Sequence, residues 1–133
     1  MEEFDAKPYC EVAMEFAQKF QKHFSYQEKD VDEMEEILGI LHQDYQNQEL
    51  SDETLQKIAV FFGVYLGQIM LDSKLSECGY VWDGEQICLK KDDKNKMYPV
   101  SKVYKRIVNG IEDSVKSFYD VAIAIAEGRF PHH

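Results

Sequence analysis

The chain of 133 residues carries 25 Asp and Glu residues against 15 Lys and Arg residues, which gives a formal net charge of −10 at pH 7. This charge argues against sequence-independent binding to DNA or RNA and against binding to anionic membranes, because both depend on basic side chains. Apolar residues make up 44% of the chain, which excludes a disordered composition. The length of 133 residues indicates a single domain over residues 1–133, and the elements predicted below make it an α+β domain.

The sequence shows no sign of export or of membrane insertion. The N-terminal residues are acidic and lack the apolar segment of a secretion signal. The longest apolar run, residues 58–71, is too short to span a bilayer. Three cysteines, Cys10, Cys78 and Cys88, form an odd set that favours reduced thiols. We therefore expect a cytoplasmic protein.

Charge is distributed unevenly along the chain. Residues 28–53 hold ten acidic side chains and one basic side chain, whereas residues 90–106 hold seven basic and two acidic side chains. In the structural interpretation, the two segments are a solvated helix face and a Lys-rich turn. In the functional interpretation, the acidic segment forms a docking surface for a basic partner.

Residues 8–25 are predicted to form the first helix, which begins at Pro8, a residue suited to the first turn. The apolar residues of this segment recur on one arc at helical spacing, and the arc extends as far as Phe24. We expect this arc to face the core.

Residues 30–49 are predicted to form the second helix. Its core face repeats at spacings of three and four residues and comprises Val31, Met34, Leu38, Leu41 and Tyr45. The opposite arc holds Asp32, Glu33, Glu36 and Asp44, with Ile40 in its middle and Glu35 on its flank. An isoleucine ringed by carboxylates is typical of the centre of a protein-binding surface, although single exposed isoleucines are common on any protein.

Residues 51–73 are predicted to form a helix that is apolar on nearly all sides and therefore central. Ser51 is suited to cap its N-terminus. Gly63 and Gly67 lie on one edge, where they allow a neighbouring backbone to approach closely. Gln68 is the polar exception, either exposed to water or buried and hydrogen-bonded by the segment that follows.

Residues 79–100 are predicted to form a small antiparallel sheet of two or three strands. A hairpin over 80–89 turns at Asp83-Gly84, so that residue 82 pairs with 85 and residue 79 with 88. In that register Cys78 and Cys88 lie on opposite faces, which excludes a disulfide between them. A third strand is expected over residues 97–100.

Two further helices are predicted, over residues 100–109 and 112–127. In the first, Lys102, Lys105 and Arg106 are expected on the outside and Tyr104 on the inward face, so the tyrosine cannot interleave with the basic side chains. In the last helix, Ile111 is counted with the residues of the buried face. The predicted fold thus has about five helices, arranged around the central helix, and one small sheet.

No motif in the sequence identifies a reaction. Metal-binding pairs of Cys or His, phosphate-binding glycine loops and serine nucleophile motifs are all missing. His42 shares a helix face with Glu35 and Glu49, but a single histidine among carboxylates is usually a surface group. Cys10 has no predicted base beside it. We expect no catalytic residue, no metal and no cofactor.

The second half of the chain contains a recognisable order of motifs. Gly63-x-Tyr65-x-Gly67, Trp82, Pro99, Lys105-Arg106-x-x-Asn109-Gly110 and Phe118-Tyr119 resemble a family of small uncharacterised bacterial domains. The resemblance covers residues 54–119 and implies a bacterial, cytosolic origin and a shared scaffold. It implies no activity and no catalytic residues.

The leading hypothesis is a non-enzymatic protein-binding module, similar to the immunity proteins that inhibit basic toxins. Its acidic helix face would dock on a basic partner through Asp32, Glu33, Glu36, Ile40, Asp44 and Tyr45. An alternative is a small-molecule or enzymatic site between the central helix, the hairpin and the basic helix, formed by Gln68, Trp82, Lys102 and Arg106. A third possibility is a homodimer in which the acidic helix of one copy meets the basic helix of another.

Overall fold

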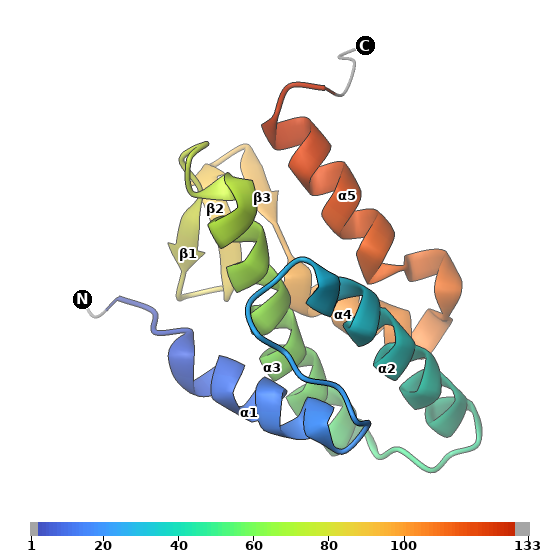
Figure 1. Cartoon of the computed structure of the whole chain (residues 1–133). Coiled ribbons are helices and arrows are strands. Elements are labelled where there is room, and N and C mark those ends of the chain that lie inside the picture. The colour runs from blue at the N-terminus through green and yellow to red at the C-terminus, as the bar shows by residue number, and fades with distance from the viewer. Residues whose placement is uncertain (1–2, 130–133) are drawn as a thin grey trace.

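The computed structural model describes residues 3–129, within which five α-helices and a three-stranded antiparallel sheet are formed (Figure 1). The helices are α1 (Lys7–Gln18), α2 (Lys29–Gln46), α3 (Asp52–Met70), α4 (Pro99–Asn109) and α5 (Val115–Ala126). The strands are β1 (Val81–Asp83), β2 (Cys88–Asp92) and β3 (Asn95–Met97). A π-helical turn, η1 (Leu71–Leu75), extends α3, and a 3-10 turn, η2 (Ile111–Asp113), joins α4 to α5. The predicted α+β class is confirmed.

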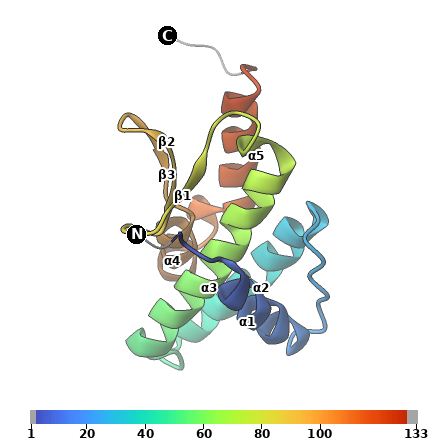
Figure 2. The same cartoon turned by 90° about the vertical axis from the view of Figure 1, so that its left-hand side faces the viewer.

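Helix α3 is the centre of the fold. In Figure 2 it runs through the middle of the molecule, with α1 and α2 on one side and the sheet and α4 on the other. Its N-terminus is capped as predicted, because the Ser51 side chain accepts a hydrogen bond from the Thr54 backbone N–H at 3.2 Å. The segment Asp52–Leu75 is long and apolar enough to cross a membrane, but 67% of its most apolar window is buried in the fold, which is consistent with the core helix of a soluble protein.

Glycines on one edge of α3 bring other elements into direct contact with its backbone. A Cβ atom on Gly63 would lie 2.4 Å from the Val100 Cα at the start of α4. A Cβ atom on Gly67 would lie 2.4 Å from the Trp82 Cη2 on β1. The close approach expected from the sequence is therefore confirmed, and it sets the distance between α3 and α4.

Helix α1 ends at Gln18, and the predicted continuation to residue 25 is wrong. The backbone N–H of Lys22 bonds back to Ala17, and Gln21 adopts a left-handed φ of 60°, which stops the helix. Phe24 is buried nonetheless, because its ring stacks on Tyr65 with a centroid distance of 4.8 Å. The spacing therefore identified Phe24 correctly as a buried residue, although an irregular loop and not a helix carries it into the core.

The loop between α1 and α2 is held by Asp30, whose side chain is fully buried. Its Oδ2 accepts hydrogen bonds from the Tyr65 hydroxyl at 2.6 Å and from the backbone N–H of Ser25 at 2.8 Å and of Gln27 at 3.1 Å. Burial, followed by the bond to Asp30, raises the pKa of the Tyr65 hydroxyl, which therefore remains a donor. The bonds tie the loop to α3.

The hairpin has a different register from the predicted one. Asp83 pairs with Cys88 and Trp82 with Leu89, so the loop has four residues, and Ile87 within it adopts a φ of 49°. This register places Trp82 over α3, where it covers Gly67. The third strand ends at Met97 and not at residue 100, because Pro99 begins α4. The three cysteines are free.

The outward face of α4 also differs from the prediction. Arg106 is buried, with 5% of its surface exposed, whereas Tyr104 is 40% exposed. The inferred separation of Tyr104 from the basic residues is therefore wrong, since Lys105 beside it is also exposed. Ile111 lies in η2 and is 71% exposed, so it does not belong to the buried face of the last helix.

We expect Gly63→Ala to destabilise the protein by about 2–3 kcal/mol, because the added Cβ overlaps the backbone of α4 and outweighs the better helix propensity of alanine. Gly39→Ala in α2 is the matched control, because its Cβ would meet only the far end of the Arg106 side chain, at 3.3 Å, and no backbone atom. We expect this variant to be as stable as the wild type or more stable by up to about 1 kcal/mol. Urea unfolding measures the stability of both variants. An equal loss of stability in the two would contradict the close contact of Gly63 with α4.

Candidate functional site

The outer stripe of α2, which we define as Asp32, Glu33, Glu36, Ile40 and Asp44, is exposed at Asp32, Glu36 and Ile40 and half-buried at Glu33 and Asp44. Ile40 is 49% exposed, whereas the other aliphatic and Met side chains of α2 are at most 3% exposed. Glu36 and Asp44 precede and follow Ile40 by four residues and therefore flank it along the helix. The fold thus leaves one large apolar side chain of α2 in solvent, between carboxylates.

Lysines of the same chain partly neutralise this stripe. Lys22 forms an ion pair with Glu36, Lys29 lies 3.6 Å from Glu33, and Lys116 lies 3.8 Å from Asp32. Within residues 3–129, no lysine, arginine or histidine forms an ion pair with Asp44. Such pairs at the surface contribute little free energy, so a partner can displace them.

A hollow of about 570 Å³ lies beside Ile40, between the end of α1 and α2. Its apolar lining comes from Phe20, Ile37 and Ile40, while Lys19 and Lys22 stand on the α1 side. The predicted ring of carboxylates is therefore open on that side, because α1 ends early and the following turn brings two lysines next to α2. Tyr45, the remaining predicted contact residue, is half-buried against the core.

The alternative site predicted from the sequence is only half assembled. Trp82 Nε1 donates a hydrogen bond to Gln68 Oε1 at 3.1 Å, so the segment after α3 does satisfy Gln68. The Phe4 ring packs on Trp82 with a centroid distance of 5.2 Å. Neither Lys102 nor Arg106 lines the two hollows beside Trp82.

Both cations of that alternative site are paired elsewhere. Lys102 forms an ion pair with Asp113 at 2.9 Å, and Arg106 Nε donates a hydrogen bond to Glu35 Oε2. The prediction placed these cations on the outer face of α4, but α4 packs against α2 as well as α3, so its Arg106 face is covered.

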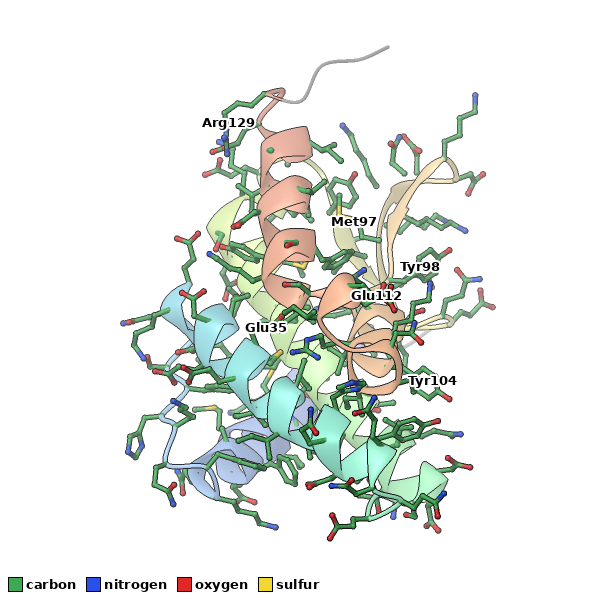
Figure 3. The ribbon with its side chains drawn as sticks, turned by 90° about the vertical axis from the view of Figure 1, so that its right-hand side faces the viewer. Glu35, Met97, Tyr98, Tyr104, Glu112 and Arg129 are labelled. Atoms are coloured by element: carbon green, nitrogen blue, oxygen red, sulfur yellow. The ribbon has the colours of Figure 1, made fainter. Side chains whose placement is uncertain are left out.

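Glu35 has a structural role that the sequence reasoning missed. Its Oε1 accepts hydrogen bonds from the Ser114 hydroxyl at 3.0 Å and from the Val115 backbone N–H at 2.8 Å, while Oε2 binds Arg106. One carboxylate therefore caps the N-terminus of α5 and neutralises a cation of α4. Figure 3 shows Glu35 on α2, near the start of α5. The available sequence signal was Ser114, a capping residue directly before an apolar segment.

Burial makes Cys10 a poor nucleophile. Cys10 is 1% exposed, and burial raises the pKa of its thiol to about 11 despite a hydrogen bond with Tyr26 that lowers it. A thiol with so high a pKa carries little thiolate at neutral pH. Over residues 3–129, no three His, Cys, Asp or Glu side chains are grouped so that they could hold a metal ion.

We expect Glu35→Gln to destabilise the protein by about 3 kcal/mol, because it leaves the buried Arg106 guanidinium without its counter-charge. Glu36→Gln, one residue further along α2, removes an exposed pair with Lys22 and should change stability little. Thermal and urea unfolding of the two variants test this contrast. Equal stability of the two variants would show that the buried pair contributes no more than the exposed one.

The cysteines should differ in reactivity. At pH 8 we expect the half-buried Cys78 to react with Ellman's reagent first, whereas Cys10 and Cys88 are buried, and burial raises the pKa of both thiols. Mass spectrometry of partly labelled protein identifies the site, and labelling in urea supplies the reference rates. Early labelling of Cys10 in the folded protein would contradict the structure.

Comparisons of this chain with protein-family models, with curated proteins and with solved structures gave no match.

Proposed function

We propose that this chain is a non-enzymatic protein-binding module, and that the outer stripe of α2 is its contact surface for a basic protein. The observation that carries the proposal is Ile40, which is 49% exposed beside an apolar hollow on a helix whose other large aliphatic side chains are buried. An apolar centre with a charged rim is the usual anatomy of a protein–protein contact. A single isoleucine in such a position can contribute much of the binding free energy.

The charge of the chain selects the kind of partner. The net charge is −10, and Asp32, Glu33, Glu36 and Asp44 lie along one strip of α2. The pair of Lys22 with Glu36 is solvent-exposed, so an arginine of the partner can replace Lys22 there, whereas Lys29 is also paired with the buried Asp30. Carboxylates of this kind raise the rate of encounter with a basic surface. This surface fits a basic protein that is inhibited when it is bound, as toxins are by immunity proteins.

The competing functions have less support from the geometry. A ligand site around Trp82 lacks its predicted cations, because Lys102 and Arg106 are engaged with Asp113 and Glu35. A homodimer of acidic α2 with basic α4 meets the same obstacle, since only Lys105 of the three predicted basic residues is not paired within residues 3–129. The protein-binding surface on α2 is therefore the proposal that we retain.

Site-specific photo-crosslinking in the native cell tests the contact surface. A benzoylphenylalanine at position 40 should capture a basic protein that the same residue at position 81 does not capture. Val81 is the matched control because it is 62% exposed and lies on β1, across α3 from α2 (Figure 2). The captured protein is then purified for binding measurements with the full chain.

With that partner, we expect Ile40→Ala and Glu36→Lys each to weaken binding by about 10-fold, whereas Val81→Ala leaves it unchanged. The association rate should fall as salt rises from 50 to 500 mM, because carboxylates steer the encounter. Capture of the same proteins from positions 40 and 81, or wild-type affinity in both α2 variants, would remove the support for this surface.

A further inference from the structure

Helix α5 is more apolar than its place in the fold requires. Of its 12 residues only Lys116 and Asp120 are charged, and these two form an ion pair with each other. Its inner side is buried through Val115, Tyr119 and Ala122, and the helix packs against α2, α4 and η1. In Figure 1, however, α5 lies at the edge of the molecule, and no element of the described chain covers its outer side. A helix that is apolar on nearly all sides is normally covered on nearly all sides.

The outer face of α5, which we define as Ser117, Phe118, Val121, Ala124 and Ile125, is an apolar strip. At 3.6 residues per turn these side chains lie on one arc of about 120°, with Val121 in its middle. Val121 is 42% exposed and Ile125 is 44% exposed, whereas Phe118 and Ala124 are half-buried. The fold therefore leaves large apolar side chains of α5 in solvent, next to two small residues.

The shape of this face is complementary to itself. Phe118 and Ile125 lie on one side of Val121, and the small residues Ser117 and Ala124 lie on the other. A two-fold rotation about an axis through Val121 reverses the helix direction and exchanges the two sides. It therefore places Ile125 of one copy opposite Ser117 of the other, and Phe118 opposite Ala124. Large side chains that face small ones allow two helices to pack closely.

The charges at the ends of α5 fit the same rotation. In Figure 3 α5 lies at the front of the molecule, with Arg129 beside its upper end on the left and Glu112 beside its lower end on the right. The rotation brings Arg129 of one copy towards Glu112 of the other at both ends of the contact. Glu112 forms no ion pair within residues 3–129, and the side chain of Arg129, which pairs with Glu127, is 64% exposed. Both side chains can therefore take part in pairs between copies.

We propose that the outer face of α5 binds a second copy of this chain, in a symmetric homodimer whose two α5 helices pack antiparallel about an axis through Val121. The face is separate from the outer stripe of α2, so the inference is independent of the proposed function. A helix of 12 residues is only about 18 Å long, which is short for a permanent interface. We therefore expect a weak dimer, with a dissociation constant of about 10–100 µM.

Sedimentation equilibrium of the full chain tests the dimer. Each copy has a net charge of −10, so salt should screen the repulsion between copies and lower the dissociation constant by about 3-fold between 50 and 500 mM. Val121→Asp places two carboxylates together on the axis and should raise the dissociation constant at least about 10-fold. Val12→Asp is the matched control, because Val12 is 46% exposed on α1 and the charge change is the same. Both variants should melt as the wild type does in dilute solution.

Cysteine cross-linking tests the register of the two helices. Val121→Cys should form a covalent dimer under oxidation by copper phenanthroline, because position 121 meets its own copy on the axis. Ser117→Cys and Ile125→Cys should cross-link when the two proteins are mixed, and much less when either is alone. Wild-type protein controls for the native thiols, and Val12→Cys controls for random collision.

The proposal is overturned if the chain stays monomeric up to about 1 mM, or if Val121→Asp dimerises as the wild type does. A dimer that weakens as salt rises would indicate pairing of acidic α2 with basic α4 instead. If the purified chain is monomeric and Val121→Cys cross-links only to a different protein in the cell, the face is a site for that protein. If only a chain shortened to residue 129 dimerises, residues 130–133 cover the face and not a second copy.

Discussion

The arrangement of the three helices α2, α4 and α5 depends on one carboxylate, that of Glu35. It accepts hydrogen bonds from Arg106 on α4 and from Ser114 and Val115 at the start of α5, so three helices meet at two oxygen atoms. Because the group is largely buried, water cannot replace these bonds at low cost. Gly63 sets how closely α4 packs on α3, and Glu35 connects α4 to α2. A shift of α4 at one of these contacts therefore disturbs the other.

The elements that the sequence predicts well are those in which one physical signal dominates. Helix α3 is apolar on nearly all sides and carries a serine cap, so its central place and its start follow from composition and local chemistry. The early end of α1 could not be predicted, because Phe24 continues the helical spacing and is buried through a ring stack with Tyr65, which is distant in sequence. The hairpin register likewise depends on Trp82 reaching Gly67, a contact between segments.

In the candidate sites too, features set by local sequence could be predicted, whereas features set by contacts between distant segments could not. The exposure of Ile40 was predictable, since the periodicity of α2 places it opposite the core face. The pairing of Lys22 and Lys116 with the acidic stripe was not, because these lysines come from the turn after α1 and from α5. Arg106 was expected on the outer face of its helix with Lys102 and Lys105, but its partner Glu35 lies 71 residues away, and no local pattern links the two.

The glycine edge of α3 has a consequence for how this protein is made. Val100 and Trp82, which cover Gly63 and Gly67, follow α3 in the chain, so α3 leaves the ribosome before its cover exists. In that interval α1 and α2 shield one side of the helix, while the other side presents a bare apolar strip to the solvent or to a chaperone. Synthesis interrupted between α3 and α4 therefore yields a fragment that is prone to aggregation and proteolysis and does not fold independently.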